Sequence, residues 1–221
     1  MSKKAAWALY IFLAVSVGLY PLAYLLFDMR GGLLGTKTAA LLQNRTWQAF
    51  FYSHISLGGV ALLTGWSQFM PRFRARHLPL HRTLGKIYVA AVMGSGLAGL
   101  YIAFYATGGL VSSLGFGMLA TLWLGTTWKA YDLIRKRAPI EHREWMIRSY
   151  ALCFAAVTLR LWLPLFTAGF KLSFYDAYPL IAWLCWVPNL LVAEAIIRIK
   201  PWRKRASPVA TKGITPMQKV G

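Results

Sequence analysis

Long apolar stretches alternate with short polar connections along most of this chain. A helix that crosses a bilayer needs about 20 mainly apolar residues. Six stretches reach that length: residues 5–27, 47–70, 87–107, 114–134, 145–168 and 178–199. The pattern predicts an all-α, polytopic membrane bundle of six transmembrane helices within residues 1–200. Residues 201–221 are polar and basic, and we expect them to form a disordered cytoplasmic tail.

Composition and charge agree with a membrane protein. Hydrophobic residues make up 57% of the chain and charged residues only 14%, whereas a soluble domain has about 25% charged residues. The net charge of +19 would indicate nucleic acid as the partner of a soluble protein. Here the cations lie in short clusters between apolar stretches. We therefore expect contact with the lipid bilayer and its anionic headgroups, and no nucleic acid.

The basic residues also predict an orientation. They concentrate before the first stretch, after the sixth, and in the second-to-third and fourth-to-fifth connections. The remaining connections carry only Arg30, Lys37, Arg45 and Lys171. Because cytoplasmic loops are enriched in Lys and Arg, both termini are predicted to be cytoplasmic. The location that follows is a membrane, crossed several times.

Two ionisable residues fall deep inside predicted spans. His54 is about 10 Å and Arg160 about 12 Å from the outer end of its helix, at 1.5 Å rise per residue. Ionisable groups at such depth are costly and often functional. His54 either packs against a neighbouring helix or contacts a ligand. Arg160 either extends to the headgroups or holds an anionic or carbonyl group in a cavity.

A second polar cluster is expected near the cytoplasmic ends of the middle helices: Gln68, His81, Arg82, His142, Arg143 and Arg148. His81-Arg82 and His142-Arg143 belong to a weak parallel repeat, and Tyr88 and Tyr150 follow at similar offsets. A pseudo-two-fold axis would turn the two histidines toward each other. They could then ligate a b-type haem, with arginines meeting its propionates. Alternatively, the pairs anchor headgroups and fix the topology.

Sequence motifs for soluble-type catalysis are absent. The chain contains no zinc spacing, phosphate-binding glycine loop, nucleophile elbow or HExxH motif. We therefore expect no metal site other than that haem, and the sequence leaves open whether the protein is an enzyme.

Several short motifs resemble one known family. They are His54-x3-Gly58, Leu62-Leu63-x-Gly65-x2-Gln68, His81-Arg82-x2-Gly85-Lys86-Ile87-Tyr88 and His142-Arg143-x-Trp145-Met146-Ile147-Arg148-Ser149-Tyr150, with Arg160. This combination is similar to the bacterial predicted membrane proteins grouped as domain of unknown function 2306. The similarity covers about residues 50–165 and implies a polytopic inner-membrane protein. It implies no reaction, ligand or catalytic residue.

Three hypotheses for the function follow. The first is a b-type haem or quinone-linked membrane redox carrier, with His54, His81, His142 and Arg160 at the cofactor and Gln68, Arg82, Arg143 and Arg148 as further ligand contacts. The second is a small transporter or lipid-handling protein, in which Arg160 and His54 hold an anionic substrate in an outer polar cavity. The third is a non-catalytic subunit bound to a larger membrane complex or to a second copy of itself.

Overall fold

The computed structural model describes residues 2–27 and 32–199. Within these ranges every regular element is a helix, so the all-α class is confirmed. The predicted tail, residues 201–221, lies outside the described residues. The main helices are α1 (Lys3–Leu19), α2 (Ala23–Leu26), α3 (Ala39–Gln43), α4 (Arg45–Gly65), α5 (Pro71–Arg76), α6 (Leu78–Ala103), α7 (Gly109–Arg135), α8 (Pro139–Cys153), α9 (Ala155–Pro164), α10 (Phe174–Leu184) and α11 (Val187–Ile199).

Capping side chains and prolines mark the first turns of several helices. The side chains of Ser2, Thr38, Asn44 and Ser173 cap the first turns of α1, α3, α4 and α10, as short polar residues commonly do. A proline occupies the first turn of α6 and of α8, where its missing N–H is not needed. Helix α6 starts at Leu78 rather than at residue 87, and both His-Arg pairs lie near the first turns of their helices.

Five stretches of the described residues are long and apolar enough to cross a membrane: Lys4–Leu22, Leu78–Ala103, Gly109–Arg135, Pro139–Gly169 and Phe174–Ile199. The second predicted span, residues 47–70, is helical but is not among them. Polar residues such as Gln48, Ser53 and His54 dilute the apolar character of α4. The count of six spans is therefore not confirmed by length and composition alone.

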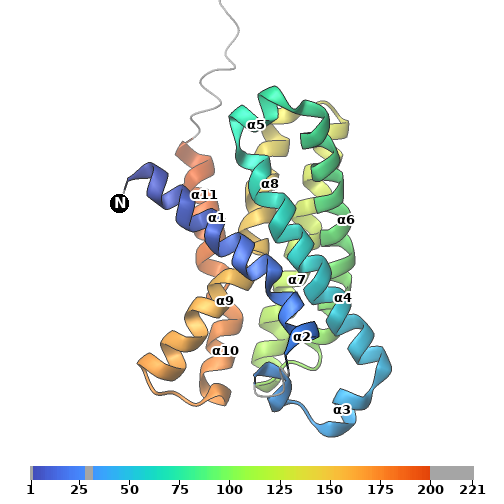
Figure 1. Cartoon of the computed structure of the whole chain (residues 1–221), viewed down its shortest axis with the longest axis vertical. Helices are drawn as coiled ribbons and strands as arrows, with labels where there is room; N and C mark the ends of the chain where they lie inside the picture. The colour runs from blue at the N-terminus through green and yellow to red at the C-terminus, as the bar shows by residue number, and fades with distance from the viewer. Residues whose placement is uncertain (1, 28–31, 200–221) are drawn as a thin grey trace, which may run out of the picture.

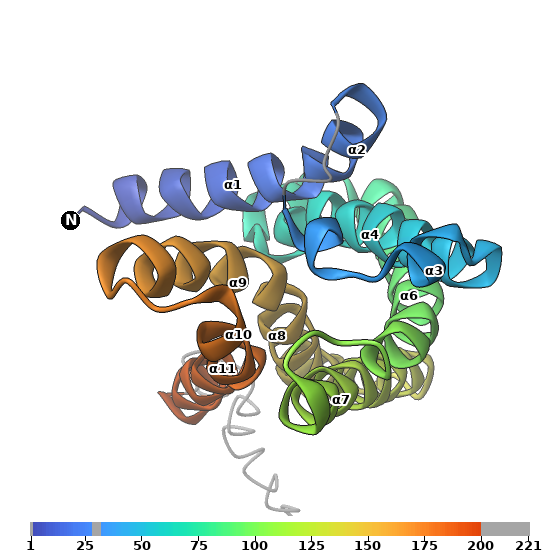
Figure 2. The same ribbon diagram turned by 90° about the horizontal axis from the view of Figure 1, so that it is seen from below.

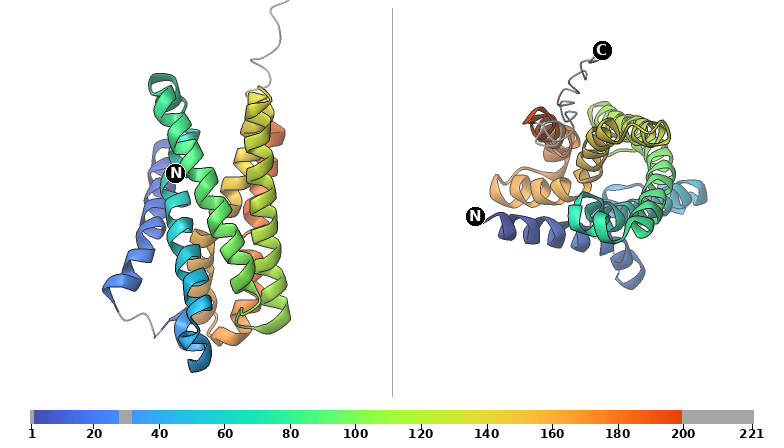
Figure 3. Two further views of the ribbon diagram at one scale, coloured as in Figure 1. Left: turned by 90° about the vertical axis from the view of Figure 1, so that its right-hand side faces the viewer. Right: turned by 90° about the horizontal axis from the view of Figure 1, so that it is seen from above.

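The central helices α4, α6, α7 and α8 form a ring around the long axis of the molecule (Figures 1 and 2). Helix α4 packs on α6, α6 on α7, α7 on α8, and α8 returns to α4. Seen from above, α6 and α8 lie diagonally opposite each other (Figure 3). Helix α1 lies outside α4, and α10 and α11 cover α7 and α8. We call the end that bears α5 in Figure 1 the upper end.

A buried polar layer crosses the ring near its middle. The Tyr88 hydroxyl and the Ser149 Oγ are 2.7 Å apart, and Thr127 Oγ1 lies 2.6 Å from the same Ser149 oxygen. The Tyr150 hydroxyl donates to the Leu62 carbonyl at 3.1 Å. These hydrogen bonds join all the ring helices, and satisfying such groups is obligatory inside an apolar bundle. We call Leu62, Tyr88, Thr127, Ser149 and Tyr150 the tyrosine layer.

The last two predicted spans are broken rather than straight. Helix α8 passes into α9 at Phe154, and α10 passes into α11 at Cys185 and Trp186. Hydrogen bonds join the two breaks: Thr158 donates to the Cys185 carbonyl, and the Asn189 amide donates to Thr158 Oγ1 at 3.0 Å. The α9–α10 hairpin consequently projects sideways at the lower end (Figure 1).

Lys37 closes the lower end of the ring. Its ammonium donates to the Tyr105 carbonyl at 2.5 Å and to Thr107 Oγ1 at 2.8 Å. These bonds tie the segment before α3 to the connection between α6 and α7. Burial lowers the pKa of the Lys37 ammonium from 10.5 to about 8, because desolvation disfavours the charged form.

Replacing Gly65 with alanine is expected to destabilise the bundle by about 1–3 kcal/mol through overpacking. A Cβ at this position would lie 2.2 Å from Tyr150 Cε2 and 2.9 Å from Tyr88 Cε2. Gly117→Ala is the matched control, because nothing lies within 4 Å of a Cβ on that helical glycine. Thermal unfolding in one detergent compares the variants. Equal unfolding temperatures for Gly65→Ala and Gly117→Ala would contradict the packing of the tyrosine layer.

The stability of the protein is expected to rise with pH between about 8 and 10.5 through Lys37. Below this window the lysine is charged in both states. Within it, the folded lysine has lost the proton that the unfolded lysine still binds, so higher pH favours folding. The measurement is the unfolding temperature of the wild type minus that of Lys37→Met. This difference should grow across the window, and a constant or falling difference would refute the assignment.

Candidate functional site

The lower half of the ring encloses a mostly apolar cavity of ≈ 230 Å³. Its walls come from α4, α6, α7, α8 and the α9–α10 hairpin. The polar and charged side chains in the lining include His54, Ser95, Arg160 and Lys37. The predicted depths of His54 and Arg160 thus correspond to one shared cavity. We call it the lower cavity.

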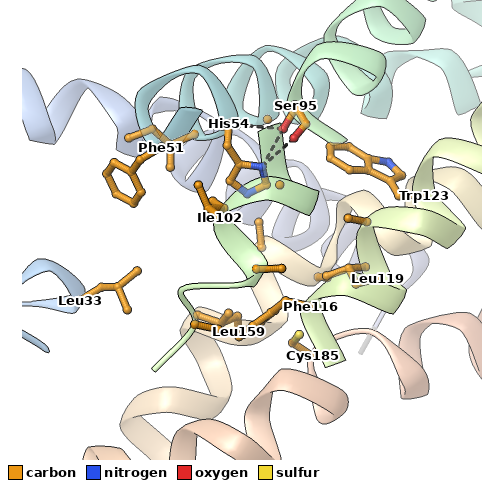
Figure 4. Close-up of a pocket in the computed structure, with 18 of the residues that line it drawn as sticks. Leu33, Phe51, His54, Ser95, Ile102, Phe116, Leu119, Trp123, Leu159 and Cys185 are labelled. Carbon is orange, nitrogen blue, oxygen red and sulfur yellow. Dashed lines mark hydrogen bonds between the residues drawn. The ribbon is translucent and has the colours of Figure 1, made fainter. Parts of the chain in front are cut away.

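His54 is held in a fixed orientation at the wall of the lower cavity. Its Nδ1 lies 2.9 Å from the Ser95 carbonyl, and the Ser95 hydroxyl donates to the His54 carbonyl at 2.8 Å (Figure 4). A carbonyl only accepts, so Nδ1 carries a proton, and in the neutral ring Nε2 is then an acceptor. Gly99 gives the ring its space, since a Cβ there would stand 3.0 Å from Nδ1.

Arg160 lies on α9 at the wall of the same cavity. Its Nη1 donates to the Ala156 carbonyl at 2.8 Å, and its guanidinium carbon lies 4.4 Å from the centre of the Tyr20 ring. The ring face partly compensates the charge through a cation–π contact. Among the described residues, no carboxylate forms an ion pair with Arg160. The guanidinium is therefore a cation in an apolar setting, and some of its N–H groups remain available to donate hydrogen bonds.

A second cavity, of ≈ 840 Å³, lies at the upper end of the ring. We call it the upper cavity. Predicted site residues from three segments line it: Gln68, His81, Arg82, His142 and Arg143. Its volume falls within the range of about 300–1,000 Å³ that is usual for ligand sites. The described cations in its lining are Arg74, Arg82, Lys86, Arg135, Arg137 and Arg143, and no acidic residue is among the lining residues.

The two histidines of the upper cavity come from the diagonal helices α6 and α8. Both line the upper cavity. His142 Nδ1 lies 2.7 Å from the Ala130 carbonyl, which leaves Nε2 with a free lone pair. The Nδ1 atom of His81 is buried and has no hydrogen-bond partner among the described residues. His81 and His142 thus offer unused nitrogen atoms beside one cavity.

The remaining predicted site residues divide differently from the expectation. His54 does not join His81 and His142, because the tyrosine layer separates the two cavities along every ring helix. Arg148 lines neither cavity. Its Nη2 donates to Glu194 Oε2 at 3.0 Å and its guanidinium carbon lies 4.7 Å from the centre of the Trp145 ring. Pairing with Glu194 on α11 gives Arg148 a role in helix packing.

Sequence reasoning missed three contributors to the lower cavity. Ser95 and Gly99 sit in a run of small residues without an ionisable group, and Lys37 counted only as a weak topology signal. A contact distant in sequence sets each role, such as His54 with Ser95 or Lys37 with Thr107. The run of small residues on α6 is the one local signal that could have indicated close approach of another group.

Comparison with known proteins places the chain in a family. A family described as "Predicted membrane protein (DUF2306)" matches residues 51–197. Neither curated proteins nor solved structures gave a match. The matched region contains the ring helices from Phe51 onward and the α9–α11 segment, so it includes every histidine of both cavities. The chain belongs to the DUF2306 family of predicted membrane proteins.

Proposed function

We propose that the protein is a membrane-embedded redox carrier that holds a b-type haem in the upper cavity, with His81 and His142 as axial ligands. The observation that carries this proposal is the pair of histidines on diagonal helices beside one cavity of ≈ 840 Å³. A haem with two axial histidines supplies one-electron transfer.

The chemistry of the two imidazoles supports coordination. A histidine that ligates a metal usually donates its other ring nitrogen to a carbonyl or carboxylate, which fixes the tautomer and the direction of the free nitrogen. His142 has this arrangement through the Ala130 carbonyl. For His81, the buried and unpartnered Nδ1 is costly in the ligand-free protein. Coordination at Nδ1 would give this nitrogen the partner that it lacks.

The rest of the upper cavity suits an amphipathic, dianionic ring system. Phe69, Leu78, Val89, Ile134 and Met146 provide apolar surface. Arg82 and Arg143 each follow one of the histidines in sequence and line the same cavity. Arginine binds carboxylates with charge-assisted, often bidentate hydrogen bonds. We therefore assign haem propionates to the arginine-rich rim, where they would offset the mutual repulsion of the cations.

The purified protein, expressed with ample haem, is expected to show a Soret band and the reduced-minus-oxidised visible bands of a b-type cytochrome. His81→Ala and His142→Ala should each reduce the bound haem to a small fraction of the wild-type amount, because each removes one axial ligand. His77→Ala and His54→Ala are the matched controls. The first changes an exposed histidine outside the cavity, and the second changes the histidine of the other cavity.

Absorbance per mole of monodisperse protein measures the outcome. A colourless wild-type preparation would overturn the proposal. It would also be overturned if His54→Ala lost the haem while His81→Ala and His142→Ala kept it. To exclude a simple loss of folding, thermal unfolding of the two ligand variants is compared with that of haem-free wild type.

We further propose six spans, with α4 completing the count and both termini in the cytoplasm of a bacterial inner membrane. The cations around the upper cavity would then face anionic headgroups on the cytoplasmic side. The first residues of α1 and the last of α11 both lie toward this upper end, which supports a common side (Figure 1).

A fluorescent protein fused after residue 199 should fluoresce, and alkaline phosphatase fused at the same point should be inactive, because the end is cytoplasmic. Phosphatase inserted in the connection before α10, residues 170–173, should be active. The opposite pattern of activities would overturn the proposed orientation. Two active phosphatase fusions, or two inactive ones, would overturn the proposal that the α10–α11 segment crosses the membrane.

A further inference from the structure

We infer that the lower cavity is a binding site for a small lipophilic carboxylate, held at its charged end by Arg160. This site is separate from the proposed haem site and does not depend on it. The inference rests on the charge balance, the polar groups and the size of the lower cavity.

The charge balance favours an anion. Arg160 and Lys37 line the cavity, and no acidic residue is among the lining residues. Within the described ranges, Arg160 satisfies one N–H with the Ala156 carbonyl and rests one face on Tyr20. A guanidinium has five N–H donors and stays charged in proteins. Its free donors match the two oxygens of a carboxylate, which arginine commonly binds through parallel hydrogen bonds.

In this assignment His54 does not bind the anion. Its Nδ1 proton is directed to the Ser95 carbonyl, and the opposite side of the ring faces the cavity (Figure 4). The neutral ring therefore presents an acceptor, Nε2, rather than a donor. The positive charge that a ligand meets comes from Arg160, with Lys37 nearer to the lower opening between the connections it joins.

The remaining lining selects a small, apolar body. Phe51, Phe116, Leu119, Trp123 and Leu159 surround the space drawn in Figure 4. A volume of ≈ 230 Å³ lies below the range of about 300–1,000 Å³ that accommodates drug-sized ligands. The cavity is therefore too small for a haem or for a whole diacyl lipid. A monocarboxylate with one ring or a short chain meets the requirements of charge, apolarity and size.

The test compares benzoate with benzamide, which have the same ring and nearly the same shape but differ in charge. Benzoate should raise the unfolding temperature of the detergent-solubilised protein and bind in titration calorimetry. Benzamide should bind about tenfold more weakly or not at all, as expected for loss of a charge-assisted pair. Equal binding of the two probes, or no binding of benzoate at millimolar concentration, would overturn the inference without any variant.

Variants locate the site. Arg160→Gln should weaken benzoate binding about tenfold or more. Arg198→Gln, which changes an exposed arginine on α11 outside the cavity, should leave benzoate binding unchanged.

A second probe, 4-iodobenzoate, should quench tryptophan fluorescence. Trp123→Phe should reduce that quenching more than Trp128→Phe, because Trp128 is 62% exposed on the same helix. Equal effects of the two tryptophan variants would place binding elsewhere. Benzoate binding that survives in Arg160→Gln would likewise refute the assignment.

Discussion

The tyrosine layer is the constraint on which both cavities depend. A ring of helices with polar residues inside has two ways to fill its centre, one continuous channel or separate chambers. Here Tyr88, Ser149 and Thr127 are fully buried and hydrogen-bonded to one another, and Tyr150 binds the backbone of α4. The hydroxyl groups are satisfied by one another and need no water molecule, and the tyrosine rings fill the cross-section of the ring of helices. The interior is thereby divided into an upper cavity rich in cations and a lower cavity that is mainly apolar.

Much of the helical framework could be predicted from the sequence, because apolar stretches of membrane length are a strong signal. The pairing of His54 with Arg160 also followed from helical rise alone, which sets depth. In the sequence, Tyr88 and Tyr150 follow the two His-Arg pairs at similar offsets, and in the core their ring centres lie 6.2 Å apart. The break at Phe154 was not predictable, because no proline marks it and it rests on hydrogen bonds between distant residues, such as that of Thr158 with Asn189. The break at Cys185 and Trp186 does have a local signal, because Pro188 lies in the first turn of α11.

The sequence alone does not indicate which of several partners a charged side chain contacts. The sequence offers Arg198 to Glu194 at the favourable helical spacing, yet Glu194 binds Arg148 across two helices through both carboxylate oxygens. That contact removes Arg148 from the upper cavity. Acidic residues are few, so each pairing decides which cations remain uncompensated. Within the described residues, no acid lines either cavity, and no carboxylate is paired with Arg160.

The three histidines that line the two cavities differ in their surroundings. His54 and His142 each direct Nδ1 to a backbone carbonyl, but only His142 shares its cavity with a second histidine and a set of arginines. His54 is instead adjacent to one arginine and aromatic walls. We proposed a dianionic macrocycle for the first surroundings and a small monoanion for the second because the two cavities differ in volume and in charge. The two sites also stand on opposite sides of the tyrosine layer, so a substitution that empties one leaves the walls of the other intact. Loss of haem and loss of carboxylate binding are therefore separable, which makes either proposal refutable while the other stands.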